Sequence, residues 1–261
     1  MELKVLHDKN IIFNFLKQDS GLQVYLIGDL DIFFWSKTIW YSLIEAHNIK
    51  AIALLYVGMN PPTLLLFNNG DKFHSIQLLE KLKTILPNKL NVHLSANLLQ
   101  VFGKENIIEY YGFNYKMLLK QKVSFSGDKN IRKLIIDDLP LIQEFYKVSY
   151  PQNWFDSRML KTNKYYGYFI DEKLVGISGV HVYSEEYKVA ALGNIATHPD
   201  FRGQQIGFKL TSALCCDLQK TVDYIGLNVK SDNEYAIKCY KKIGFEVVGE
   251  YDECFIKNGS V

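Results

Sequence analysis

One stretch in the second half of the chain, residues 189–220, constrains the fold more than any other part of the sequence. An apolar run over residues 189–197 predicts a buried strand, which a proline-containing turn and a glycine-rich loop join to a helix at 208–220. Leu210, Leu214 and Leu218 recur on one face of that helix. A chain that passes from a buried strand through a short loop into a helix favours the α/β class.

The loop within this stretch, residues 202–207, has the features of a phosphate-binding segment. A loop that enters a helix directs unpaired backbone N–H groups and the positive end of the helix dipole at one place, and phosphate binds there. Gly203 and Gly207 allow the backbone to come close to a ligand, and Arg202 adds a permanent positive charge. The sequence therefore predicts an anion site at the start of the helix.

A second motif lies downstream. A short apolar strand at 225–229 precedes three good N-cap residues, Ser231, Asp232 and Asn233, and the helix that follows ends at Gly244. The two motifs together resemble the GNAT superfamily of acyl-CoA-dependent N-acyltransferases. Arg202-Gly203-Gln204-Gln205-Ile206-Gly207 is similar to the family's pyrophosphate-binding signature, and the pattern N-x-x-A-x-x-x-Y-x-x-x-G-F is similar to its closing helix.

One position departs from the family's signature, because Gln205 stands where most members have glycine. If this position requires a positive φ, glutamine costs about 1 kcal/mol or more there. If the residue already has helical dihedral angles, the cost is small and the loop works unchanged. Both alternatives are open from the sequence.

The resemblance implies an α/β fold with a mixed (α+β) sheet, and a GNAT fold in the second half of the chain. We expect a catalytic domain over residues 126–261, with its boundary in the segment 122–130. The strands that we expect in it are 131–136, 165–170, 174–183, 189–197, 225–229 and a pair of short strands within 246–256. The expected helices are 139–148, 155–161, 208–220 and 234–243.

Residues 1–125 carry a weaker version of the same pattern. We expect strands at 49–57, 63–67 and 90–94 and a helix at 77–86, and Gly112-Phe113 echoes Gly244-Phe245 at a similar spacing. The stretch 68–72, in the place of the phosphate loop, has no arginine, and Asp71 would repel phosphate. We interpret this half as a degenerate GNAT-like domain without a CoA site. An unrelated α/β domain is the alternative.

Composition narrows the class of protein further. A chain of 261 residues with 48% apolar and 22% charged residues is typical of a globular protein. Its net charge of +2 gives no electrostatic argument for a nucleic-acid or membrane partner. The sequence shows neither a long apolar segment nor a signal peptide, so we expect a cytoplasmic protein. The four cysteines lack metal-ligand spacing, and we expect reduced thiols and no metal.

The resemblance also implies roles for individual residues. The backbone of residues 195–197 would pair with the pantetheine arm of CoA, and the amides of 203–208 with Arg202 would hold the pyrophosphate. Asn233 would line the pantetheine channel, and Tyr240 would be the general acid near the CoA sulfur. The implied acetyl-CoA-binding residues are Ile195, Ala196, Thr197, Arg202, Gly203, Gln204, Gln205, Ile206, Gly207, Phe208, Asn233 and Tyr240. The alternatives are a solvated Arg202, an Asn233 that acts only as a cap, and a Tyr240 that packs in the core.

The general base is harder to assign, because the expected central strand at 189–197 contains no acidic residue. Asn194 could order a water there. Glu253 is our preferred base, since its strand corresponds to one that edges the acceptor site in the family. The predicted catalytic residues are therefore Tyr240, Glu253 and Asn194. Other candidates for the base are His181, Glu185, Glu186 and Asp252, whereas His198 reads as a turn residue.

The implied activity is transfer of an acetyl group from acetyl-CoA to the primary amine of a small-molecule or amino-acid-like acceptor, by direct attack in a ternary complex. The aromatic segment 150–166 would suit an acceptor with an apolar part, or would simply pack in the core. Residues 193–199 are similar to the matching region of glycine N-acyltransferases, so a longer acyl donor stays open. A non-catalytic acyl-CoA-binding or regulatory protein is the other alternative. A homodimer also remains open.

Overall fold

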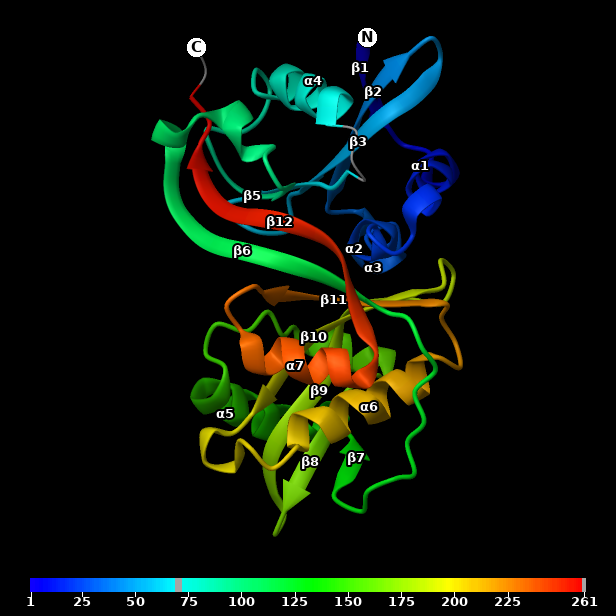
Figure 1. Cartoon of the computed structure of the whole chain (residues 1–261), viewed down its shortest axis with the longest axis vertical. Helices are drawn as coiled ribbons and strands as arrows, with labels where there is room; N and C mark the ends of the chain where they lie inside the picture. Colours follow the sequence, from blue (N-terminus) through cyan, green and yellow to red (C-terminus); the bar gives the residue numbers. More distant parts are fainter. Residues whose placement is uncertain (69–71, 260–261) are drawn as a thin grey trace. The chain divides into compact units, whose positions relative to one another are not determined.

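A computed structural model describes residues 1–68 and 72–259, and Figure 1 follows its helices and strands along the chain. The chain divides into two compact units. The first unit contains Met1–Lys116, Val229–Asp232 and Val247–Val261, and the second contains Met117–Asn228 and Asn233–Glu246. This division differs from the expected boundary at 125/126, because the C-terminal strand of the chain belongs to the first unit.

The second unit is built on strands in the order β11-β10-β9-β8-β7, in which only β10 and β11 are parallel. Hairpin β8–β9 turns through Asp171 and Glu172, which both have positive φ, as the favoured two-residue turns require. The strands are β7 (Ile131–Lys133), β8 (Tyr166–Ile170), β9 (Lys173–Ser184), β10 (Val189–Thr197) and β11 (Tyr224–Lys230). The helices are η4 (Ile136–Asp138), α5 (Leu139–Ser149), η5 (Ser157–Thr162), η6 (Pro199–Phe201), α6 (Ile206–Leu218) and α7 (Glu234–Ile243).

The first unit has strands in the order β1-β2-β3-β4-β5-β12, in which only β4 and β5 are parallel. Helix α4 (Lys72–Leu82) buries Leu78, Leu79 and Leu82 against this sheet. The strands are β1 (Glu2–Leu6), β2 (Thr38–Glu45), β3 (Asn48–Tyr56), β4 (Thr63–Leu66), β5 (Lys89–Ser95), β6 (Ile107–Leu119) and β12 (Phe245–Lys257). The other helices are α1 (Lys9–Leu16), η1 (Lys17–Asp19), α2 (Val24–Gly28), α3 (Ile32–Trp35), η2 (Leu99–Phe102) and η3 (Lys104–Asn106).

The two units repeat one topology. With the short helices α2 and α3 and the 3₁₀ segments left aside, the order in the first is β1, α1, β2, β3, β4, α4 and β5, and in the second it is β7, α5, β8, β9, β10, α6 and β11. In each unit one helix connects the single pair of parallel strands, which is the crossover that parallel neighbours need. The mixed α/β fold, and a first half that repeats the pattern of the second, are therefore as the sequence predicts. Across residues 1–68 and 72–259, no helix combines the length and the apolar character that a membrane crossing requires.

Several predicted elements differ in extent. Strand β7 ends at Lys133 rather than 136, because the Asp138 carboxylate accepts the Ile135 amide at 2.9 Å and starts a 3₁₀ turn. The second helix is the 3₁₀ segment η5, and the predicted pair of short strands within 246–256 is the single strand β12. Helix α4 starts and ends earlier than 77–86. Gly112 lies inside β6, so its echo of Gly244, which ends α7, does not mark the same local structure. Part of the stretch 68–72, Asn69–Asp71, lies outside the described residues.

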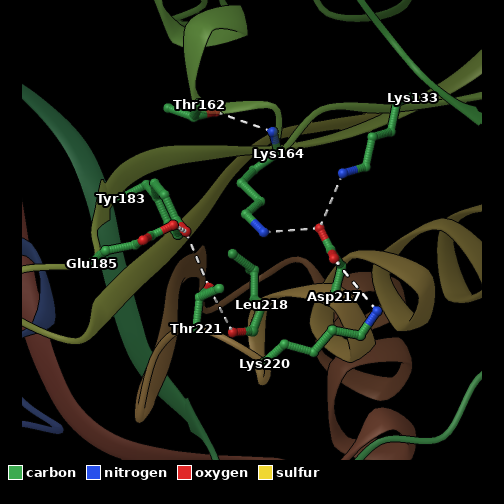
Figure 2. Close-up of polar contacts among 9 residues, drawn as sticks. All are labelled: Lys133, Thr162, Lys164, Tyr183, Glu185, Asp217, Leu218, Lys220 and Thr221. Atoms are coloured by element: carbon green, nitrogen blue, oxygen red, sulfur yellow. Dashed lines mark hydrogen bonds and ion pairs between the residues drawn. The ribbon is translucent and has the colours of Figure 1, made fainter.

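Ion pairs fasten the C-terminal end of α6 (Figure 2). The Lys164 ammonium donates to Asp217 Oδ2 at 2.9 Å, and the Nζ atoms of Lys133 and Lys220 each lie 3.6 Å from the same carboxylate. Only 9% of the Lys164 side chain is exposed. Burial raises the pKa of Asp217, but the hydrogen bond and charge of Lys164 outweigh it and hold the pKa below its usual value. The helix is thereby fixed at the end opposite the glycine-rich loop.

Gly179 of β9 provides a test of this packing. A Cβ atom there would overlap the ring of Tyr165, which is fully buried. We expect Gly179→Ala to lower the free energy of unfolding by about 1–3 kcal/mol, because an overpacked core must shift. Urea unfolding measures the effect. Gly207→Ala is the control, since its Cβ would meet only Thr197 Oγ1 at 3.6 Å. Equal stability of the two variants would contradict the packing described.

Candidate functional site

The parallel strands β10 and β11 separate partway along their length. Their pairing runs from Val189 opposite Tyr224 to Leu192 opposite Leu227, although β10 continues to Thr197. On its other edge, β10 stays paired with β9 up to Thr197. In the described register, the β11-facing edge of residues 193–197 therefore has backbone groups that no strand covers. An extended ligand with amide groups could add there as a strand would.

A bulge lies where the separation begins. The register between β10 and β9 shifts between Gly193 and Ala196, which places an extra residue in β10. Asn194 adopts φ +55° within the bulge, a conformation that asparagine tolerates better than most residues. A bulge bends its strand, so this one directs residues 195–197 away from the line of the strand before it.

The loop after β10 leads into α6, and its first residues are hydrogen-bonded within the η6 turn. His198 Nδ1 accepts the Asp200 amide at 3.3 Å and caps the η6 turn, and Arg202 Nε donates to the Thr197 carbonyl at 3.4 Å. The first amide to bond back into α6 is that of Lys209, to the Gln205 carbonyl at 3.0 Å. The amides of residues 206–208 come before it, so they lack partners within the helix. These amides are open to a ligand, and the anion site that the sequence predicts at this helix start stays a prediction.

Gln205 is the N-cap of α6, with φ 60° and ψ 14°. The structure therefore decides between the two alternatives left open by the sequence, because this position does require a positive φ. A non-glycine residue there carries strain of about 1–2 kcal/mol. Gly203, with φ +79°, meets the same requirement without strain.

This strain is measurable. The relief of about 1–2 kcal/mol exceeds the entropic cost of a new glycine, about 0.5–1 kcal/mol. We therefore expect Gln205→Gly to raise the free energy of unfolding by about 0.5–1 kcal/mol in ligand-free protein. Gln204→Gly is the matched control, because Gln204 does not share the positive φ, and it should lower stability. If both changes were destabilising, Gln205 would not be strained.

A cavity of about 480 Å³ lies along α6 on the side covered by residues 121–128. Phe208 and Lys242 line it, with the Lys242 Nζ 4.8 Å from the centre of the Phe208 ring. Lys209, also in the lining, pairs with Asp128 at 2.9 Å and so holds the covering segment to the helix. The volume of this cavity falls in the range of small-molecule sites.

The two predicted side chains on α7 are placed as follows. Asn233 caps the helix, with Oδ1 accepting the Ala236 amide at 3.2 Å. Tyr240 is half-buried and meets the ring of Phe245 edge to face, with centroids 6.0 Å apart. The cap of Asn233 and the packing of Tyr240 are thus both present, and each leaves the functional role to be tested.

Glu185 and Glu186, which lie between β9 and β10, are not near the N-terminal end of α6, where the glycine-rich loop enters. Glu185 accepts a hydrogen bond from the Tyr183 hydroxyl, and the oxygen of that hydroxyl also lies 3.1 Å from Thr221 Oγ1 (Figure 2). Thr221 lies beyond the C-terminal end of α6, and a helix of that length spans about 20 Å. Glu185 and its exposed neighbour Glu186 are therefore remote from the phosphate loop. His181, by contrast, lies beside Gly193 at the bulge.

Glu253, the preferred base, lies on β12 in the first unit. Its carboxylate meets His93 Nε2 at 3.4 Å and accepts from Asn114 Nδ2 at 3.2 Å, with 24% of the side chain exposed. Burial raises the pKa of Glu253, but His93, Lys230 and Asn114 together hold it below its usual value. Glu253 is thus ionised at neutral pH, as a base must be, and its catalytic role stays a prediction. Asp252 is engaged by the Tyr110 hydroxyl at 2.8 Å.

The Asn194 side chain is committed to protein contacts. Its Oδ1 accepts the Trp154 amide at 3.0 Å, and its Nδ2 donates to the Tyr165 hydroxyl at 2.9 Å. These bonds engage both polar atoms of the side chain that would order a water, and the catalytic role expected for Asn194 stays a prediction. Tyr146 belongs to the same network, because its hydroxyl donates to the Asn194 carbonyl. Sequence reasoning missed this residue, since nothing in the local sequence of α5 (Leu139–Ser149) marks it. Among the described residues, no group of three or more His, Cys, Asp or Glu side chains is arranged for a metal.

Comparison with known proteins shows which family this part of the chain resembles. Residues 129–245 match the model of the acetyltransferase (GNAT) family. A protein of Bacillus subtilis (strain 168), named "Putative ribosomal protein bS18-alanine N-acetyltransferase", is 28% identical over 138 residues, which cover 49% of this chain and 88% of that protein.

Two solved structures share the fold over the whole chain. The X-ray structure of a Drosophila protein has a TM-score of 0.71 at 10% identity and covers 99% of both chains. A tandem GNAT protein from the clavulanic acid biosynthesis pathway has a TM-score of 0.62 at 13% identity and covers 100% of both chains. At these identities the likeness concerns the fold alone. It agrees with the repeated topology of the two units.

Proposed function

From the membership of residues 129–245 in the GNAT acetyltransferase family, we propose that this chain transfers an acetyl group from acetyl-CoA to a primary amine. The observation that carries the proposal is the opening between β10 and β11, which leads directly to a loop with free amides at the start of α6. The open edge of β10 suits the amides of a pantetheine arm, and the loop at the start of α6 suits a pyrophosphate. Acetyl-CoA carries both groups in that order.

The binding roles follow from the placement of each group. The backbone of residues 195–197 would hold the pantetheine arm, and an N–H of the same strand would face the thioester oxygen. The amides of residues 203–208, assisted by Arg202, would bind the pyrophosphate. The cavity beside Phe208 and Lys242 supplies an aromatic face and a cation for the adenosine and its phosphate. Asn233, as the cap of α7, would border the channel.

The chemistry needs no covalent enzyme intermediate. An amine held against the thioester attacks the carbonyl carbon, and positioning supplies much of the rate. The amine must lose a proton and the CoA thiolate must gain one. We assign Tyr240 as the acid. Glu253 is our predicted base, and His181 is the alternative because it lies at the bulge.

The acceptor class follows from weaker support. The Bacillus subtilis relative is named for N-acetylation of an alanine of ribosomal protein bS18, which supports the primary amine of an amino-acid-like acceptor here and says nothing for other small molecules. A longer acyl donor and a non-catalytic acyl-CoA-binding protein are the competing functions. Turnover of acetyl-CoA with a panel of amines separates these three, since only the first gives acetylated amine.

Binding of acetyl-CoA to the loop is the first test. We expect calorimetric titration to give micromolar affinity for the wild type. Gly207→Asp should abolish it, because the added carboxylate would repel phosphate where the amides converge. Asp200→Asn is the charge control, since Asp200 belongs to the η6 turn before the loop, and it should bind normally. Failure of the wild type to bind would overturn the proposed function.

The acid role of Tyr240 is tested separately. We expect Tyr240→Phe to lower kcat tenfold or more with little change in acetyl-CoA affinity, because the ring stays against Phe245 and only the hydroxyl is lost. Steady-state kinetics and calorimetry on the same preparation measure both quantities. Unchanged turnover would remove Tyr240 from the mechanism.

A further inference from the structure

We propose that Asn194 is a positioning residue that couples Trp154 to residues 195–197 of β10, the segment that would hold the pantetheine arm. In this proposal the Trp154 indole forms one wall of the place where the thioester meets the amine. The proposal rests on the proposed function. It assigns to Asn194 a role that is mechanical rather than chemical, and it adds a residue, Trp154, on the acceptor side of the site.

The first step is the backbone of Asn194. Its φ of +55° belongs to the bulge from which residues 195–197 run along the opening. The Asn194 carbonyl accepts the hydroxyl of Tyr146, on α5, at 2.6 Å. That hydroxyl is buried, so the bond fixes the bulge to a helix of the same unit.

The second step is the side chain. Only 7% of Asn194 is exposed, and its amide reaches three different partners of the segment between α5 and β8. Oδ1 accepts the Trp154 amide at 3.0 Å, while Nδ2 donates to the Tyr165 hydroxyl at 2.9 Å and lies 3.7 Å from Met159 Sδ. Tyr165 passes the constraint on, because its hydroxyl donates to the Val180 carbonyl of β9 at 2.8 Å. One side chain therefore holds both β10 and the segment that faces it.

The third step is the contrast between two neighbouring rings. Phe155 packs inward, with its centroid 5.5 Å from that of Tyr146 and 5.4 Å from that of Tyr165. The next residue back, Trp154, has its backbone tied to Asn194 but 55% of its surface exposed. A large ring held at its backbone and left open on its face is arranged as a contact surface. Because the tie is to the residue just before 195–197, that surface lies at the acyl end of the strand rather than at the phosphate end.

Tryptophan emission provides a direct readout. The chain has three tryptophans, and the other two, Trp35 and Trp40, lie in the first unit. We expect acetyl-CoA to change the emission of the wild type, and Trp154→Phe to remove that change. Adenosine 3′,5′-bisphosphate, which carries the nucleoside, the 3′-phosphate and one phosphate of the pyrophosphate but no pantetheine or acyl group, should leave the emission unchanged at saturation.

Asn194→Gly tests the coupling itself. Glycine keeps the positive φ, and the carbonyl that meets Tyr146 remains, so calorimetry should give an acetyl-CoA affinity within about threefold of the wild type. The tie to Trp154 is lost, so the emission change should fall by more than half. Asn163→Gly is the matched control, because Asn163 is also at positive φ in the same unit but is exposed. It should respond as the wild type does.

A second variant separates the effect of the backbone conformation at position 194 from the effect of the side-chain amide. Asn194→Ala also loses the tie but strains the bulge, so we expect it to melt at a lower temperature than Asn194→Gly and to bind acetyl-CoA more weakly. An Asn194→Gly protein with the full emission change would overturn the coupling. A bound wild type without any Trp154 signal would overturn the placement of the indole. A wild type that shows no calorimetric binding would overturn the proposed function, and the coupling with it.

Discussion

The separation of β10 from β11 after Leu192 is the constraint on which the site in the second unit depends. Backbone groups without partners are costly when buried, so a strand is left half-paired only where something holds it open. Here the bulge at Asn194 bends β10, and the Tyr146 hydroxyl holds the bulge. Helix α6 is anchored at its far end by the pair of Lys164 and Asp217. The loop between these fixed points can then keep its amides free for a ligand.

The first unit shows what happens when this constraint is absent. Its parallel pair, β4 and β5, stays in register to Leu66 opposite Leu94, the last residue of β4. The contact continues beyond the strand, since the Asn68 amide donates to Ser95 Oγ at 3.0 Å. No slot for an extended ligand opens between these two described strands. The same topology can therefore carry parallel strands that separate or strands that stay paired, which supports our interpretation of residues 1–125 as a degenerate half.

Periodicity and capping residues predicted the elements whose interactions are local in the sequence. The strand at 189–197 and the helix ended by Gly244 appear where periodicity and capping placed them, and α6 begins two residues earlier than expected. Features that depend on distant partners were not predictable in this way. Residues 251–257 of strand β12 pair with β5, which lies more than 150 residues earlier in the chain, and this pairing places Glu253 in the first unit. The Asn194 network joins α5 to β10 through side chains that no spacing connects.

Gln205 shows what the family's signature encodes. In the proposed function the loop would bind through backbone amides, so what matters at each position is the dihedral angle rather than the side chain. Glycine is favoured at position 205 because it adopts a φ near 60° without strain, yet glutamine reaches the same angle at a cost of about 1–2 kcal/mol. That cost is small beside a typical folding stability of about 5–15 kcal/mol. The departure from the signature is therefore a modest loss of stability, and position 205 keeps the positive φ that glycine would adopt there.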